Sequence, residues 1–290
     1  MSKPINLSSY KIILVALDLH DDVSVVLSQA GFLAKQYQAK LHIVHVLPHV
    51  YTSVPYAYDF QAEMEKDAEK RLAKVKSESV YPVTEAHLVT GSPKHEILEL
   101  AKKIHADLLV VGSHGKHGVQ LLLGSTANSV LHGAVCDVLT IRIDYSGRGE
   151  AHGPYHHLVV ASDLREEGRK VLARAQCFVQ DFKATWEVVH VVPDEATLAS
   201  IYVPNIEEDL AKQAEIRIKK LAHEYQLKES EVHVLRGEAK LEISDYLTSS
   251  HSDLLVVGSH GRSLLQSAFL GSTANALLHG AKQDVLVVKI

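Results

Sequence analysis

The chain has 290 residues, which is enough for about two domains of ordinary size. Hydrophobic residues make up 46% and charged residues 22%, as in a soluble protein with a sizeable core. The formal net charge is −5, and no block of Lys and Arg supplies the positive footprint that nucleic-acid binding needs, so a nucleic-acid partner is excluded. The first residues lack the apolar length of a signal peptide or a membrane span, so we expect a cytoplasmic protein without membrane association.

Cysteine and histidine usage bounds the chemistry further. The two cysteines, Cys136 and Cys177, fall in different halves of the chain, which is no disulfide framework and suits a reducing compartment. The nineteen histidines are scattered, and the nearest approach to a ligand pair is His114 with His117, without acidic or cysteine companions. Because a zinc site needs three or four fixed ligands, we expect no metal site among them and interpret them as solvated surface residues.

The first half alternates between strand and helix patterns. Continuous apolar runs are typical of strands buried on both faces, and apolar residues three and four apart are typical of helices. These patterns predict strands at 12–17, 41–47, 85–89, 108–111 and 138–143, and helices at 23–37, 60–75 and 94–105.

The second half repeats this order. The run K-I-I-L-V-A-L-D that ends at Asp18 returns as H-H-L-V-V-A-S-D ending at Asp163, 145 residues later. The blocks D-L-L-V-V-G-S-H-G and G-S-T-A-N also occur twice. A repeat of this length is a duplicated domain. We expect one domain over 1–146 and another over 155–290, joined by a Gly-, Pro- and polar-rich linker at 147–154.

Alternating strands and helices of this length predict the α/β class, with a parallel open sheet and helices on both faces in each domain. Such sheets bind ligands outside the carboxyl ends of their strands, where the strand order reverses. Asp18 and Asp163 follow the first strands, and a glycine-rich loop follows the fourth strand of each half. These places are expected to face one crevice.

The glycine-rich loops have the composition of an anion-binding cradle. Glycines allow the backbone to approach a ligand and permit positive φ, and the amides of a helix start can bind phosphate. The hydroxyl residues that follow, Ser125 with Thr126 and Ser272 with Thr273, stand where a helix cap is expected, and each hydroxyl can cap the helix or contact an oxyanion. An ordinary strand-to-helix turn with a capped helix stays an alternative. Asp18 and Asp163 likewise either cap a helix or contact ribose, adenine or a phosphate-bound metal.

Other phosphate and nucleophile motifs are absent. The chain has no G-x-x-x-x-G-K-[ST], no G-x-G-x-x-G after its first strand and no G-x-S-x-G elbow. We also find no paired carboxylates with a cleft to themselves and no nucleophile with an assigned base, so no catalytic residue is predicted.

The segment G-S-H-G-(x9)-G-S from Gly258 to Ser272, together with V-V-A-S-D and V-H-V-V-P, resembles the universal stress protein family over essentially the whole chain, as a tandem pair. The resemblance implies two five-stranded parallel sheets of a Rossmann-like, adenine-nucleotide alpha-hydrolase-like fold. It also implies ATP in the crevice, often together with Mg²⁺ or Mn²⁺, because members with this motif bind ATP and a branch without it does not.

Matching positions carry the implied nucleotide contacts in both halves. In the second half they are Asp163 and Val191 on the adenine and ribose side, and Gly258, His260, Gly261, Gly271, Ser272 and Thr273 for ribose and phosphates. In the first half they are Asp18, Val46, Gly112, His114, Gly115, Gly124, Ser125 and Thr126. The spacer between the last two motif glycines is eight residues in the first half against nine in the second, so the second site is the safer prediction.

The family also pairs through its last strands, which implies a pseudo-dimer within the chain through residues 138–143 and 285–290, and allows a homodimer of chains. The leading functional hypothesis is a nucleotide-dependent stress regulator. Slow ATP hydrolysis is the enzymatic alternative, with only His260, Arg262, His114, Lys116 and His117 near the loops. A scaffold that binds no nucleotide and acts through its surfaces is the third.

Overall fold

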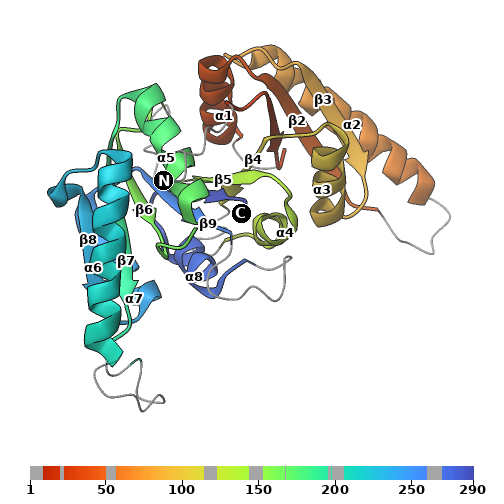
Figure 1. The fold of residues 1–290 in the computed structure, drawn as a ribbon. Coiled ribbons are helices and arrows are strands. Elements are labelled where there is room, and N and C mark those ends of the chain that lie inside the picture. The colour runs from red at the N-terminus through yellow and green to blue at the C-terminus, as the bar shows by residue number, and fades with distance from the viewer. Residues whose placement is uncertain are drawn as a thin grey trace. The chain divides into compact units, whose positions relative to one another are not determined.

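The computed structural model describes residues 9–19, 23–49, 57–113, 123–143, 153–166, 168–194, 197, 206–259 and 270–290. The chain divides into two compact units, Ser9–Pro154 and Tyr155–Ile290, which we refer to as the first and second units. Figure 1 shows the elements of both units coloured along the chain.

The first unit alternates strands and helices as its sequence predicts, within a few residues at each end. Its strands are β1 (Ile12–Ala16), β2 (Lys40–Leu47), β3 (Glu85–Thr90), β4 (Leu108–Ser113) and β5 (Asp137–Arg142). Its helices are α1 (Ser24–Tyr37), α2 (Ala57–Glu78), α3 (Pro93–Lys103) and α4 (Ser125–Gly133).

The second unit repeats the order of the first. Its strands are β6 (His157–Ala161), β7 (Thr185–Val192), β8 (Val232–Arg236), β9 (Leu254–Gly258) and β10 (Asp284–Val288). Its helices are α5 (Gly168–Phe182), α6 (Ile206–Tyr225), α7 (Ala239–Ser250) and α8 (Ser272–Gly280), with a short 3-10 turn, Glu229–Glu231, before β8.

Each unit has a parallel sheet whose strand order reverses beside its first strand. The order is β3-β2-β1-β4-β5 in the first unit and β8-β7-β6-β9-β10 in the second, and the strand pairs within each unit are parallel. Since parallel crossovers are right-handed, the reversal places the helices before and after it on opposite faces. The α/β prediction is confirmed, and the reversal opens a crevice between β1 and β4, and between β6 and β9.

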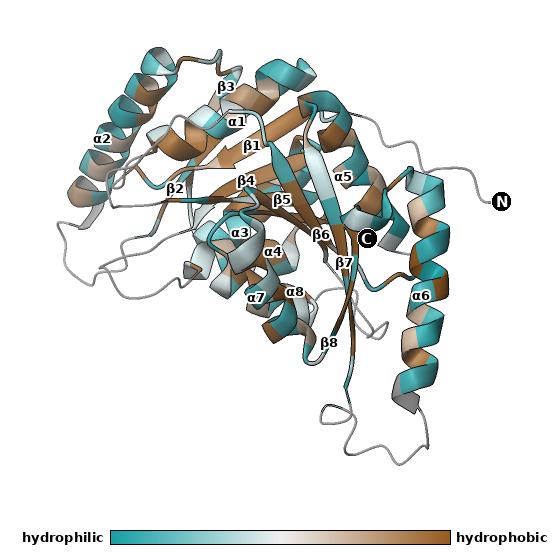
Figure 2. Cartoon of the chain, turned by 90° about the vertical axis from the view of Figure 1, so that its left-hand side faces the viewer, coloured by the Kyte–Doolittle hydropathy of each residue, from teal (hydrophilic) through white to brown (hydrophobic). Residues whose placement is uncertain are grey.

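The central strands are the core of each unit. Ile13, Leu14 and Val15 of β1 and Leu158, Val159 and Val160 of β6 are fully buried. Figure 2 shows these strands as hydrophobic ribbons, whereas α2 and α6 alternate between hydrophobic and hydrophilic faces. Strands covered on both faces need apolar residues at every position, which explains why the sequence shows continuous runs instead of alternation.

In each unit, one aspartate of the repeat accepts a backbone hydrogen bond at the amino ends of the strands. Asp107 accepts a hydrogen bond from the Lys11 amide at 2.8 Å, and Asp253 accepts one from the His156 amide at 2.6 Å. These residues begin the repeated D-L-L-V-V blocks, so the aspartate of that block fixes the start of the first strand of its unit and lies at the amino ends of the strands. The pairing of the two last strands, by contrast, stays a prediction.

Cys136, which precedes β5, is predicted to be unreactive in the folded chain. Burial, with the nearby carboxylates of Asp137 and Asp107, raises the pKa of the Cys136 thiol to about 12. Because the thiolate is the nucleophile, alkylation by iodoacetamide at pH 8 should be on the order of 10³-fold slower in the native chain than in urea. Mass spectrometry of the alkylated peptide measures both rates, and equal rates would contradict the burial of this thiol.

Among the described residues, no helix combines the length and the apolar character needed to cross a lipid bilayer.

Candidate functional site

A pocket opens at the carboxyl ends of the strands in the second unit. Its volume is about 520 Å³, within the range of about 300–1,000 Å³ that small-molecule sites occupy. The wall includes six of the predicted nucleotide contacts, namely Asp163, Val191, Gly258, Gly271, Ser272 and Thr273. Apolar side chains complete it, among them Val171, Ile243, Leu270, Leu277 and Ile290. The fold therefore brings together residues that are more than 100 positions apart in the chain.

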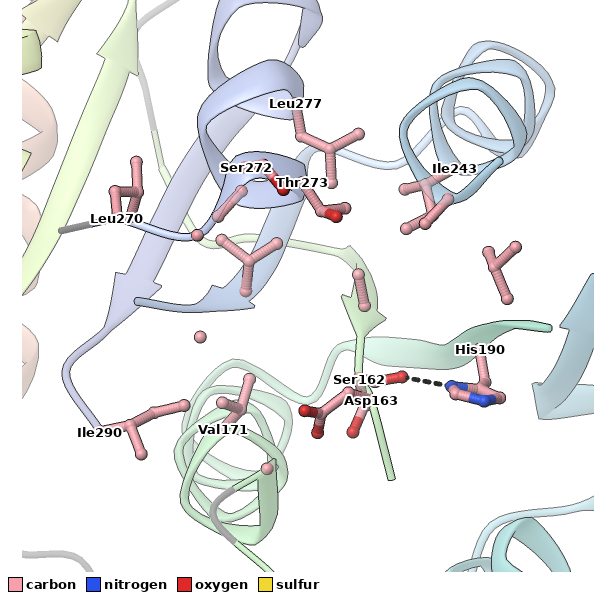
Figure 3. A pocket seen from close by; sticks show the side chains of 18 of the residues that line it. Ser162, Asp163, Val171, His190, Ile243, Leu270, Ser272, Thr273, Leu277 and Ile290 are labelled. Atoms are coloured by element: carbon pink, nitrogen blue, oxygen red, sulfur yellow. Dashed lines mark hydrogen bonds between the residues drawn. The ribbon is translucent and has the colours of Figure 1, made fainter. Parts of the chain in front are cut away.

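The start of α8 supplies backbone amides to one side of the pocket. Gly271 is the N-cap, with φ −59° and ψ 147°, and no side chain caps the helix. Asn275 is the first residue that donates to the N-cap carbonyl, at 2.9 Å, so the amides of Ser272, Thr273 and Ala274 precede the intrahelical ladder. Figure 3 shows the Ser272 and Thr273 side chains at this first turn.

The prediction that Ser125 and Ser272 stand at the cap position is wrong by one residue. Gly124 is the N-cap of α4, with φ −59° and ψ 151°, and Ser125 is already the first helical residue, as Ser272 is in α8. A serine inside the helix cannot take the extended cap conformation, so its hydroxyl does not cap its own helix. The alternative that these hydroxyls are merely helix caps is thereby removed.

Asp163 borders the pocket just after β6, with 31% of its side chain exposed. Its Oδ1 accepts a hydrogen bond from the Arg165 amide at 3.1 Å, and its Oδ2 lies 3.6 Å from the Arg165 Nε. Helix α5 begins five residues later, at Gly168, so Asp163 closes a local turn and is no helix cap. In the first unit Asp18 precedes α1, which has Val23 as its N-cap, so the capping alternative fails there too.

In each unit, a histidine that was not predicted as a site residue contacts a backbone carbonyl oxygen beside the crevice. The His190 Nδ1 lies 2.8 Å from the Ser162 carbonyl oxygen, as the dashed line in Figure 3 shows, and the His45 Nδ1 lies 2.9 Å from the Leu17 carbonyl oxygen. Each contact joins the second strand of its unit to the residue before the crevice aspartate. The sequence signal for it is the repeat of H-V-L-P, which begins at His45, as H-V-V-P, which begins at His190.

His42 and His45 of β2 are buried, with 7% and 6% of their surface exposed. The interpretation of the histidines as solvated surface residues is therefore wrong for these two. His114 and His117, the pair considered from spacing, lie outside the described residues.

The described glycines of the motif do not have a positive φ, and a close approach to a neighbouring side chain is seen at Gly112. Among the described glycines, positive φ occurs at Gly91 (155°) and Gly237 (137°), and not at Gly112, Gly124, Gly258 or Gly271. A Cβ on Gly112 would lie 2.8 Å from the Ile143 Cδ1. Gly237 directly follows β8 and lines the pocket, although sequence reasoning missed it.

Ser259 ties the fourth strand of the second unit to the helix start. Its carbonyl oxygen accepts from the Gly271 amide at 3.0 Å, and its Oγ accepts from the Ile290 amide at 3.2 Å. The first unit has the equivalent of the bond to Oγ, in which the Ile143 amide donates to the Ser113 Oγ at 3.3 Å. The equivalent of the Gly271-to-Ser259 backbone bond, from the Gly124 amide to the Ser113 carbonyl oxygen, is not formed, although the structure describes both residues. The eight-residue spacer is the sequence difference at this place.

The first unit places its predicted contacts at equivalent positions. Asp18 follows β1, Val46 lies in β2, Gly112 lies in β4, and Gly124, Ser125 and Thr126 begin α4. The remaining predicted contacts, His114, Gly115, His260 and Gly261, lie outside the described residues in both units.

Comparison with known proteins identifies relatives of both units. The sequence model of the universal stress protein family matches residues 9–142 and again residues 154–289. Universal stress protein A homolog 1 of Coxiella burnetii is 38% identical over 138 residues, which cover 46% of this chain and 96% of that protein. Homolog 2 of the same organism is 41% identical over 145 residues, covering 47% of this chain and 98% of its own length.

Solved structures share the fold over nearly the whole chain. A protein of unknown function from Pseudomonas aeruginosa PAO1 has a TM-score of 0.69 at 19% identity, covering 97% of this chain and 93% of that one. A universal stress protein from Archaeoglobus fulgidus has a TM-score of 0.68 at 19% identity, covering 96% of this chain and 98% of that one.

Proposed function

The chain belongs to the universal stress protein family, as a tandem member with two such domains, and from this premise we propose that its second unit binds ATP in the crevice pocket. Binding would make the protein a nucleotide-dependent regulator of a stress response. The single observation that carries the proposal is the juxtaposition of Asp163 with the start of α8 across one pocket (Figure 3).

The pocket suits a nucleotide in both size and polarity. Apolar side chains from α5, α7 and α8, including Val171, Ile243 and Leu277, offer a surface for a purine ring. The amides at the start of α8 offer donors to phosphate oxygens, and the helix dipole favours negative charge there. Asp163 is an acceptor that suits ribose hydroxyls. The purine, the ribose and the phosphates of a nucleotide would therefore each lie against side chains or amides of matching chemistry.

The hydroxyls of Ser272 and Thr273 add two side-chain donors beside the amides. Ser272 is exposed and Thr273 is half-buried, and neither hydroxyl is used to cap the helix. The Asp163 turn and the His190 contact fix the opposite wall before any ligand arrives. A preformed wall reduces the ordering cost of binding.

Equilibrium binding of ATP to the purified chain, measured by calorimetry with and without Mg²⁺ or Mn²⁺, tests the proposal. We expect Asp163→Asn to weaken binding about 10- to 100-fold, the cost of removing a hydrogen bond to a charged group. The matched change Asp18→Asn, at the equivalent place in the first unit, should leave that affinity unchanged. The proposal fails if the wild-type chain binds no adenine nucleotide, and that result would favour a scaffold that acts through its surfaces.

A further inference from the structure

The first unit contains a three-residue cluster far from the predicted nucleotide contacts. His42 lies near the amino end of β2, and Glu85 and His87 lie on the neighbouring strand β3. In the sheet register His42 is opposite Glu85, and Val44 is opposite His87. Residues directly opposite or two apart share one face of a sheet, so all three side chains leave the same face.

That face is the one opposite helix α2. Thr90 of β3 donates a hydrogen bond to Glu65 of α2 at 3.4 Å. Thr90 is three residues after His87, and successive residues of a strand alternate between faces. The cluster therefore lies away from α2, at the amino ends of the strands, whereas the crevice lies at their carboxyl ends.

We propose that His42, Glu85 and His87 form a binding site for Zn²⁺, or for a similar first-row transition-metal ion. Three ligand atoms already converge. The His42 Nδ1 lies 3.1 Å from the His87 Nε2, and the Glu85 Oε2 lies 3.8 Å and 3.9 Å from these two nitrogens. Among the described residues, this is the group of His, Cys, Asp and Glu side chains close enough to share an ion.

The size of this triangle matches a metal ion. A point equidistant from the three atoms lies about 2.1 Å from each, and zinc bonds to histidine nitrogen and carboxylate oxygen are about 2.0–2.2 Å long. Two imidazoles and one carboxylate leave at least one coordination position for water, the ligand number of open zinc sites. The mixed nitrogen and oxygen donors favour zinc or a similar transition metal over Ca²⁺ or Mg²⁺.

The hydrogen bond between the two imidazole rings must break before both can bind the metal. They lie nearly parallel, at 9°, with centroids 5.4 Å apart, and one nitrogen now donates to the other. If His42 carries its proton on Nε2 and His87 on Nδ1, both facing nitrogens present lone pairs, and a tilt of the rings directs them toward Glu85. No imidazole changes its charge in this exchange.

The surroundings favour the neutral imidazoles that metals bind. Burial lowers the pKa of His42 and of His87, with the Glu85 carboxylate partly opposing it at both rings. Lys40 and Lys103 place positive charge nearby, which the Glu85 carboxylate offsets.

The second unit provides an internal comparison. Its counterpart of His42, 145 residues later, is Glu187, and its counterpart of His87 is His233, opposite Val189. The Glu187 carboxylate is engaged by the Tyr246 hydroxyl at 2.6 Å and lies 3.8 Å from the His233 Nε2. The His157 Nε2 also lies 3.5 Å from the Glu187 carboxylate, but among the described residues only the first-unit group brings three ligand atoms within 4.8 Å of one another.

A bound ion would join β3 to β2. Strand β3 lies at the end of its unit's strand order and pairs with β2. Edge strands are the least constrained part of a sheet, and a ligand from each strand would restrain the pair. The first unit, and not the second, should therefore gain resistance to unfolding when metal is added.

The test uses the full chain stripped of metal with EDTA, without nucleotide, and titrated with ZnCl₂ by calorimetry. We expect one tight equivalent of Zn²⁺ per chain. Glu85→Gln and His87→Gln should each weaken it at least about tenfold, since even outer-shell partners of a metal site are worth about 10- to 100-fold. The matched change His233→Gln in the second unit should leave it unchanged.

A second readout identifies the ligands directly. Titration with Co²⁺ should produce visible absorption bands of a low-coordinate ion in the wild-type chain and in His233→Gln, and weaker or shifted bands in the two first-unit variants. Glu85 is 60% exposed, so Glu85→Gln should fold normally and keep the test valid if a histidine variant does not. Equal Zn²⁺ binding in all four chains, or no tight equivalent in the wild type, would overturn the proposal.

Discussion

Thr273→Glu should weaken ATP binding roughly 30-fold or more without lowering the stability of the chain. Thr273 is the second residue of α8 and lines the pocket. A carboxylate about 4 Å from a phosphate costs about 4 kcal/mol at an effective dielectric constant of 20, and solvent screening at this half-exposed place lowers that to roughly 2 kcal/mol. Affinity should therefore fall roughly 30-fold or more, as measured by calorimetry.

The same substitution should stabilise the helix. An acidic residue in the first turn interacts favourably with the helix dipole, by about 0.3–1 kcal/mol. The first turn of α8 now has no acidic residue. The midpoint of urea unfolding for the second unit should thus stay the same or rise, which separates lost binding from lost folding.

Thr126→Glu is the matched control, at the second residue of α4 in the first unit. It should gain the same helix stabilisation and keep the affinity of the second-unit site. If both substitutions reduce ATP affinity equally, the first unit holds nucleotide as well. If neither reduces it, phosphates do not bind at the start of α8.

Phe178→Ala should cost about 3–5 kcal/mol of unfolding free energy, the range measured for large-to-small changes of buried aromatic residues. Phe178 lies in α5 with no exposed surface, and its ring is 5.5 Å from the ring of Phe182 and 6.1 Å from that of Tyr155. The cavity would open between α5 and the sheet of the second unit.

Phe60→Ala is the control, because it makes the same substitution at an exposed position. Phe60 lies on α2 with 55% of its surface exposed. Its effect should stay within about 0.5 kcal/mol, as for most surface substitutions. Urea unfolding followed by circular dichroism measures both, and a chain of two units requires a fit that allows two transitions. Equal losses in the two variants would contradict the assignment of Phe178 to the core.

The fold could be predicted from the sequence because its central strands are apolar. Parallel strands covered on both faces need unbroken apolar runs, and β1, β4, β6 and β9 are such runs in the sequence. The prediction was least accurate at the helix start, where the sequence predicts Ser272 as the cap. Gly271 takes that place because its backbone conformation, not its side chain, sets the boundary.

The candidate nucleotide site was partly accessible from the sequence. Asp163, Gly258 and Thr273 stand at strand and helix ends in a repeated pattern, and such ends meet at one edge of a parallel sheet. Gly237 and His190 were missed, since each is a single residue whose role depends on a neighbouring strand. His190 matters through a carbonyl 28 residues away, so the repeated H-V-(L/V)-P marks the position of the histidine but not its partner.

The amino-acid sequence by itself determined the duplicated α/β architecture and the edge of the sheet at which a ligand is expected, because periodicity and repetition are properties of the chain read in order. Only the tertiary structure decided which groups converge. His42 and His87 are 45 residues apart and meet because β2 and β3 pair in one register, and a shift of one residue would turn one of them to the other face.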